Sequence, residues 1–409
     1  MNRSALNAGE RIELRRRRLG LSRRVVAQLT GRSEEWLRQI EKGSRRLDSI
    51  EMTNRLAEVL RLDDPAELTG WPSASRSDAC ELGLPLTPLK RAIMDHPSTR
   101  AFAADAQKPL PTLNSVRTAL DQCWTIWHNS GQRYTELAAR LPIAVVEARR
   151  IRAATQSRRD IPLEQAGEAL IDAYHLARFL LTRMGYFDLA WLVADRPIGI
   201  LAQSEQSILI AVSSWHVASA LLSLGYHAES RDYALAASRR LAETPLSAEL
   251  QSSTYGALQL VAAEAAAGAG DLATSDDLLE QATRGAEQLG STLHRTVWFG
   301  IPEVAITGMA IAVQLGRFDE AIRLSGGVNI PKEASVDLRV RYYLTTAYAY
   351  SQKGEDFAAA IALLEAERAC PEDIRFDWMA HRTLQKLARR DHHLIRGDLA
   401  HLLAHAGLM

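Results

Sequence analysis

The chain has 409 residues, a formal net charge of zero, 47% hydrophobic residues and 24% charged residues. This length is sufficient for two or three domains, and the composition is that of a folded globular protein, which excludes a largely disordered chain. The three cysteines, Cys80, Cys123 and Cys370, lie too far apart for a zinc motif or a disulfide framework, and the N-terminus has no apolar segment typical of a signal peptide. We therefore expect a cytoplasmic protein without a metal or cofactor.

Basic residues are concentrated at the N-terminus. Residues 1–46 contain 13 of the 49 Lys and Arg residues but only 5 of the 49 Asp and Glu residues, so this segment has a net charge of +8 and the rest of the chain −8. A basic segment joined to an acidic body favours an anionic partner for the basic segment.

Short helices are predicted over residues 1–70. Ser22 and Ser33 are predicted to cap the second and third helices through their side-chain oxygens, and Gly31 and Gly43 are predicted to end them. Two short helices joined by a tight glycine turn form a helix-turn-helix, whose second helix enters the major groove of DNA.

The sequence LGLS, the alanine five residues after its serine, the next glycine and the sequence IEKG together resemble the Xre/Cro-type family of helix-turn-helix DNA-binding domains. The resemblance implies that base edges are read by Ser33, Glu34, Glu35, Arg38 and Gln39. It implies phosphate contacts for Ser22, Arg23, Arg24, Arg32, Lys42, Arg45 and Arg46. It also implies a structural pair, Arg16 and Glu41, that ties the first helix to the recognition helix. The sequence departs from the family at Arg23, where glutamine is common, and at the two glutamates that begin the recognition helix.

Residues 71–112 have a different composition from the segments on either side. They contain six of the 14 prolines, and the stretch SASRSD is typical of a loop. We interpret this segment as a connector in which PLKRAIMDHP can hold a short helix.

Residues 208–226 form an uncharged stretch long enough to cross a bilayer. The stretch contains four serines, a histidine and a tryptophan, and no basic cluster flanks it. We therefore predict a buried helix rather than a membrane span, and we expect no membrane partner.

Five glycines divide residues 113–409 into similar units: Gly185, Gly225, Gly270, Gly316 and Gly354. Each of the first four is followed by any residue, a larger side chain, two further residues, and then alanine or serine; the fifth unit has one extra residue. The glycine would end one helix, and the small residue would let the next helix approach the first, as in stacked helical hairpins. The pattern resembles the tetratricopeptide repeat, which implies an all-α protein with a right-handed α-solenoid.

In that repeat, the first helix of each pair lines a concave surface. The resemblance places on it Asp172, His175, Trp215, Ser219, Glu264, Trp298, Phe299, Glu303, Arg341 and Tyr348. Carboxylates, an arginine and aromatic rings suit a peptide or small-molecule effector. The alternative is that Trp215, Trp298 and Tyr348 belong to the core between repeats.

The sequence favours a DNA-binding transcriptional regulator over an enzyme, because it has no phosphate loop, nucleophile elbow or zinc motif. His401 and His405 are four residues apart on a predicted helix, but no third ligand can be placed beside them, so no metal site is expected. The resemblance implies a homodimer on a pseudo-palindromic operator in double-stranded DNA. The alternative is a protein-interaction scaffold in which DNA binding is secondary.

Overall fold

The computed structural model describes residues 8–43, 50–60, 84, 86–94, 109–155, 157–158, 160–202, 204–244, 248–289, 292–293, 297–330, 334–390 and 395–408. The chain forms two compact units, an N-terminal unit, Met1–Ser75, and a C-terminal unit, Arg76–Met409. The predicted all-α class is confirmed, because the only strands among the described residues are β1 (Thr292–Leu293) and β2 (Trp298–Phe299), which pair antiparallel. None of the described helices is long and apolar enough to span a membrane.

The described residues of the N-terminal unit form four helices, α1 (Ala8–Arg18), α2 (Arg23–Leu29), α3 (Glu34–Glu41) and α4 (Ile50–Val59). Their inner faces form one core: Ile12, Val26, Ala27, Leu37, Ile40, Met52, Leu56, Ala57 and Leu60. These positions recur at helical spacing, so burying them orients each of these four helices.

The predicted start and stop signals of α2 and α3 are present in the structure. The Ser22 side chain accepts a hydrogen bond from the Val25 amide at 3.2 Å, and the Ser33 side chain accepts one from the Trp36 amide at 3.1 Å. Gly31 follows α2 with a φ of 68°, a left-handed conformation that favours glycine. The turn between α2 and α3 is therefore specified by the local sequence.

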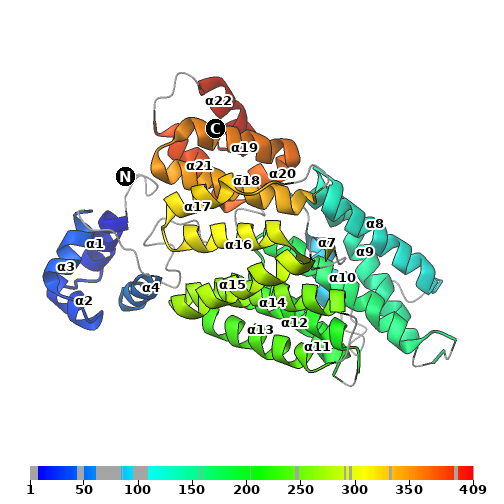
Figure 1. Ribbon diagram of the computed structural model, residues 1–409. Helices are drawn as coiled ribbons and strands as arrows, with labels where there is room; N and C mark the ends of the chain where they lie inside the picture. The colour runs from blue at the N-terminus through cyan, green and yellow to red at the C-terminus, as the bar shows by residue number, and fades with distance from the viewer. Residues whose placement is uncertain are drawn as a thin grey trace. The chain divides into compact units, whose positions relative to one another are not determined.

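The C-terminal unit is built from successive antiparallel helical hairpins (Figure 1). Its first helices are α7 (Thr87–Met94), α8 (Leu113–Asn129), α9 (Arg133–Ala154), α10 (Leu163–Arg183), α11 (Phe187–Ile200), α12 (Ser207–Ser223) and α13 (His227–Ala242). They continue with α14 (Ala248–Gly268), α15 (Leu272–Leu289), α16 (Ile301–Gln314), α17 (Phe318–Gly326), α18 (Val336–Lys353) and α19 (Asp356–Ala369). The chain ends with α20 (Pro371–Phe376), α21 (Trp378–Ala388) and α22 (Arg396–His405).

The predicted unit boundaries coincide with the turns of these hairpins. The glycines that separate the units all adopt a left-handed conformation, with φ between 73° and 84°: Gly185, Gly225, Gly270, Gly316 and Gly354. The small residues of the pattern are buried between the paired helices: Ala190, Ser230, Ser275 and Ala321. A larger side chain at these positions would push the two helices apart, which explains the recurring motif.

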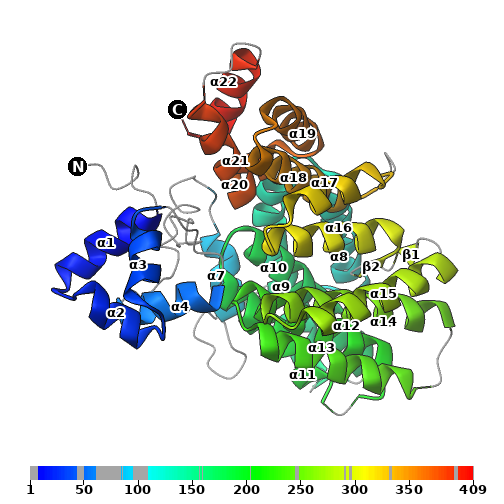
Figure 2. The same ribbon diagram turned by 60° about the vertical axis from the view of Figure 1, so that its left-hand side comes forward.

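Helices α8, α10, α12, α14, α16 and α18 form an inner layer in which each contacts the next. The first inner helix, α8, also contacts α18, and the two lie side by side in both views (Figures 1 and 2). The array therefore brings its beginning and its end together.

Buried ion pairs connect the two ends of the array. The fully buried Arg133 at the start of α9 contacts Asp373 of α20 at 2.8 Å and Asp337 of α18 at 3.1 Å. Arg183 of α10 reaches the same Asp337 at 2.7 Å. Burial alone would raise the pKa of Asp337, but Arg183 and Arg133 hold that pKa below its ordinary value.

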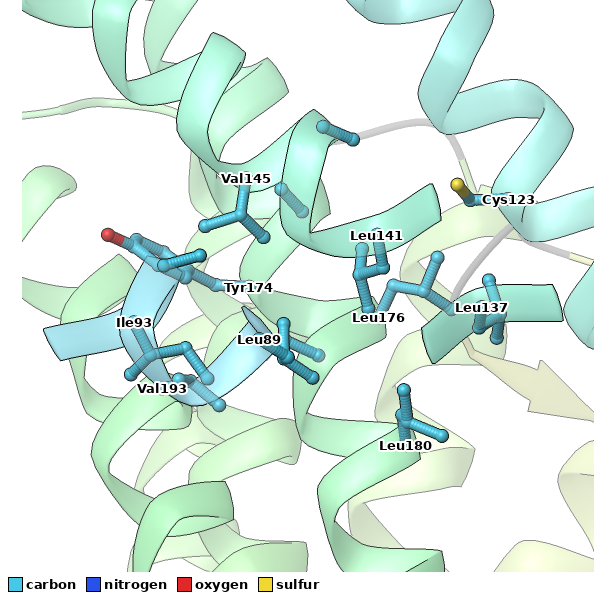
Figure 3. Close-up of a cluster of buried hydrophobic side chains, with 14 of the residues drawn as sticks. Leu89, Ile93, Cys123, Leu137, Leu141, Val145, Tyr174, Leu176, Leu180 and Val193 are labelled. Atoms are coloured by element: carbon cyan, nitrogen blue, oxygen red, sulfur yellow. The ribbon is translucent and has the colours of Figure 1, made fainter. Parts of the chain in front are cut away.

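Helix α7 lies within the stretch predicted to be a connector, yet it packs into the core of the C-terminal unit. Figure 3 shows its Leu89 and Ile93 among side chains of α9, α10 and α11. Arg149 of α9 donates hydrogen bonds to the carbonyl oxygens of Ala92 and Ile93 at the end of α7, the latter at 2.9 Å. This docking connects segments about 56 residues apart, which composition alone does not reveal.

Candidate nucleic-acid interface and effector site

Helix α3 has one buried face and one exposed face. Leu37 and Ile40 are buried in the core of the N-terminal unit, whereas Glu34 and Glu35 are exposed and Gln39 is partly exposed. The predicted structural pair fixes this orientation, because Arg16 contacts Glu41 at 2.6 and 3.1 Å with both side chains buried. The predicted base-reading residues therefore lie on a helix that is rigidly joined to α1.

Three predicted base-reading residues contact one another along α3. Glu35 accepts hydrogen bonds from Arg38 at 2.7 and 2.5 Å and from Gln39 at 3.1 Å. The hydrogen bond from Arg38 lowers the pKa of Glu35, so this carboxylate stays charged at neutral pH. Because all three side chains are solvent-accessible, they can exchange these contacts for base edges without unfolding the helix.

The predicted phosphate-binding residues fall into four groups. Arg24, Arg32 and Lys42 are exposed, and Arg32 also lies 5.8 Å from the ring centre of Trp36. Arg23 is engaged within the unit, since it contacts Glu41 at 2.5 Å and Glu13 at 3.2 Å. Ser22 is exposed and caps α2. Arg45 and Arg46 lie outside the described residues.

In the C-terminal unit, two predicted effector residues line one cavity of about 650 Å³. The cavity lies between α8, α10 and α12, and Asp172 and His175 of α10 form part of its wall. Its other charged lining residues are Arg117, Asp121, Glu168 and Glu205. Four carboxylates and one guanidinium give the cavity an acidic character, and its volume is in the range of small-molecule sites.

Asp172 has an unusual environment for a carboxylate. It accepts a hydrogen bond of 2.8 Å from the indole nitrogen of Trp124 on α8. Burial raises the pKa of Asp172 to about 7, although the Trp124 hydrogen bond opposes this increase. Its charge therefore changes near neutral pH, which is a property of ligand-binding and catalytic carboxylates.

A chain of aromatic contacts leads from this cavity across the inner layer. His175 stacks on His216 with ring centres 3.8 Å apart, and His216 lies 5.0 Å from Trp215. At the far end, the predicted effector residue Trp298 lies 5.4 Å from the ring of His128 on α8. Trp215 and Trp298 are both partly buried, so they contribute to the interior of the array and retain some accessible surface.

Glu264, Glu303 and Arg341 lie on three successive inner helices. Burial raises the pKa of Glu264 and raises that of Glu303 to about 7, and the positive charge of Arg341 opposes both increases. The residues predicted to line the concave surface therefore do not form a single cluster. These three lie on α14, α16 and α18, whereas the cavity residues Asp172 and His175 lie on α10.

Three predicted effector residues are used in packing. Phe299 is 1% exposed and fills the space over Gly256, where an added Cβ would lie 2.1 Å from the ring. Tyr348 is also buried and makes edge contacts with Phe318 and Trp378. The Ser219 hydroxyl donates to a carbonyl of its own helix at 2.8 Å. For Phe299 and Tyr348 the structure favours the core interpretation, because no surface remains for a ligand.

The structure supplies a third ligand that sequence analysis could not place beside His401 and His405. Glu367 of α19 lies next to them, and one ligand atom from each of the three residues lies within 4.8 Å of the other two. The glutamate precedes the histidines by 34 residues or more in the sequence, so no short motif indicates the cluster.

A family model described as a helix-turn-helix domain matches residues 8–69 of the chain. A search among curated proteins returned no match. The matched range contains α1 to α4, so the N-terminal unit is a helix-turn-helix domain, as predicted, and the match supports DNA binding.

Proposed function

We propose that the protein is a sequence-specific DNA-binding transcriptional regulator rather than an enzyme. The observation that carries the proposal is the exposed polar face of α3, held by the buried Arg16–Glu41 pair of a helix-turn-helix domain. The exposed basic residues Arg24, Arg32 and Lys42 lie on or next to α2 and α3 and can contact the phosphates on either side of the groove.

Two substitutions test this part of the proposal. Gln39→Ala should lower affinity for the cognate operator by roughly 1–3 kcal/mol, because one base contact is lost, and should leave non-specific binding unchanged. Gln28→Ala is the matched control, because Gln28 is exposed on α2 and has no predicted role. The measurement is a gel-shift titration with fragments selected from genomic DNA. Equal effects of the two variants, or no duplex binding by the wild type, would contradict the proposal.

The finer assignment concerns the family and the assembly. The resemblance to Xre/Cro-type domains and to tetratricopeptide repeats supports a regulator that binds as a homodimer to a two-fold symmetric operator. Light scattering of the free protein and of the operator complex measures this directly, and a monomer in both would exclude it.

We also propose that the C-terminal unit binds an effector in the cavity between α8, α10 and α12. Asp172 and His175 line the cavity together with further carboxylates, so the best-matched effector is a peptide or small molecule with a cationic group. An effector held there can alter DNA binding only through a difference in its affinity for two conformations, typically 1–3 kcal/mol of coupling.

The effector test compares two aspartate variants. Operator affinity is measured with and without cationic fractions of an extract from the native host. Asp172→Asn should keep the affinity of the free protein but reduce the response. The control Asp276→Asn, which lines a different cavity between α15, α16 and α17, should respond as the wild type does. Loss of the response only in Asp276→Asn would move the effector to that second cavity. If no fraction changes wild-type affinity, the scaffold alternative becomes the better account of the C-terminal unit.

A further inference from the structure

The last helix of the chain carries two histidines on one face. His401 and His405 are one helical turn apart on α22, and their ring centres are 4.2 Å from each other. Facing them is Glu367, which lies near the end of α19 and is 9% exposed. Three side chains that commonly bind metal ions thus meet where α19 and α22 come together.

The distances between the ligand atoms are close to those of a tetrahedral site. Glu367 Oε1 is 3.1 Å from His401 Nε2 and 2.5 Å from His405 Nδ1. With metal–ligand bonds of about 2.0–2.2 Å, the ligand atoms of a tetrahedral zinc site are about 3.3–3.6 Å apart. A small outward rotation of the His405 ring would therefore be sufficient to admit an ion.

The carboxylate oxygen between the two rings is buried without a hydrogen bond. Glu367 Oε1 has both imidazole nitrogens nearby, yet neither is aligned to donate to it, whereas Oε2 of the same carboxylate lies at hydrogen-bond distance, 3.1 Å, from His401. An unsatisfied buried carboxylate oxygen is costly. A cation placed between the three groups would satisfy it, because their lone pairs can then point to a common centre.

We propose that Glu367, His401 and His405 bind one divalent transition-metal ion, with zinc as the best-matched ion. Imidazole nitrogens select zinc, cobalt or nickel over magnesium and calcium, which prefer oxygen ligands. The two histidine side chains are 52% and 47% exposed, so water can occupy the fourth position. The ion would join α22 to α19 and so fix the C-terminal helix. This inference does not depend on DNA or effector binding.

The test uses the full-length protein after removal of metal with a chelator. Cobalt is added stepwise and followed by its visible absorption, and zinc affinity is then measured by competition with the cobalt complex. We expect one ion per chain and the strong visible bands of four-coordinate cobalt. Glu367→Gln and His401→Ala should each weaken binding by at least about ten-fold.

His381→Ala provides the matched control, because His381 is a partly exposed histidine on α21 whose ring nitrogen lies 2.7 Å from the Arg375 carbonyl oxygen and which is not part of the Glu367, His401 and His405 cluster. It should bind cobalt as the wild type does. Circular dichroism of each variant verifies that the helices remain folded. The proposal is overturned if the wild type shows no saturable binding, or if Glu367→Gln binds as tightly as wild type, since the histidines alone would then hold the ion.

Discussion

In the N-terminal unit, most charged residues of α2 and α3 lie at the surface, whereas several charged residues of the C-terminal unit are among its most deeply buried side chains. Arg24 and Lys42 are exposed, but Arg133 is fully buried and Asp373 is 1% exposed. Exposed charges remain available for a partner, and buried charges hold helices together. We infer that the exposed charged residues of the N-terminal unit serve to bind a partner, whereas many buried charged residues of the C-terminal unit hold its helices together.

Each unit nevertheless has a buried arginine–carboxylate pair that connects distant segments. The pair Arg16–Glu41 joins helices 25 residues apart, and the pair Arg133–Asp373 joins segments 240 residues apart. Removing one partner from either pair deprives a buried charge of its closest opposite charge. The two pairs therefore provide matched ways to test how each unit is stabilised.

The largest decrease in the free energy of unfolding is expected for Arg133→Ala. The substitution leaves Asp373 buried without its main partner and should destabilise the C-terminal unit by about 3–5 kcal/mol. Urea denaturation measures the loss. Arg117→Ala is the control, because Arg117 and Glu168 are each 40% exposed and their ion pair should contribute only about 0–1 kcal/mol. Equal destabilisation by both variants would contradict a role for the Arg133 pair in closing the array.

Glu41→Ala should give the second-largest decrease in the free energy of unfolding. Arg16 loses its buried partner and Arg23 loses one of two, so we expect about 3 kcal/mol of destabilisation in the N-terminal unit. Hydrogen exchange of the α1 and α3 amides measures this unit separately from the rest of the chain. Glu35→Ala, which removes the contacts with Arg38 and Gln39 on the accessible face of α3, should leave the exchange rates unchanged. Faster exchange in both variants would refute the assignment.

Local features of both units could be predicted from sequence. The caps Ser22 and Ser33, the left-handed glycines and the Arg16–Glu41 pair all depend on neighbouring residues or on a spacing within one small domain. The small residue at the start of each second helix was also predictable, because close helix packing requires it at a fixed distance from the glycine.

Contacts between distant segments could not be predicted. The docking of α7 and the Arg133–Asp373 pair depend on how many hairpins the array has and how much each rotates relative to the last. Phe299 was predicted on the concave surface because it lies about one helical turn before Glu303, but it belongs to a β-strand that precedes α16, and its ring lies over Gly256. Glu367 was missed because its partners lie in a later helix.

Arg24→Ala and Arg23→Ala should separate binding from stability within the proposed phosphate-binding set. Arg24 is exposed, so its loss should reduce the slope of log affinity against log salt by about 0.9 and leave unfolding unchanged. Arg23 contacts Glu41 and Glu13, so its loss should also speed amide exchange in α3. Filter binding at several salt concentrations gives the slopes. An unchanged slope for Arg24→Ala would remove this residue from the DNA interface.

The smallest effect concerns the pH dependence of stability contributed by Asp172. Its folded-state pKa of about 7 exceeds the ordinary value of 3.8, so the folded protein keeps a proton that the unfolded chain loses between these values. Stability from this group is therefore fully present below pH 4 and is lost as the pH rises through about 7. Because the side chain borders the cavity, where water screens its charge, the total change should be about 1 kcal/mol.

Asp172→Asn should abolish this contribution, because asparagine cannot ionise but can still accept the Trp124 hydrogen bond. The free energy of unfolding of the variant should therefore decrease less than that of wild type between pH 4 and pH 7. Glu303 and Asp377 also have raised pKa values, of about 7 and about 6, so some decrease remains in both proteins. If the two curves have the same slope, Asp172 is hydrated in the cavity and ionises normally. The cavity would then present a permanent negative charge at neutral pH, and binding of a cationic effector would vary little between pH 6 and pH 8.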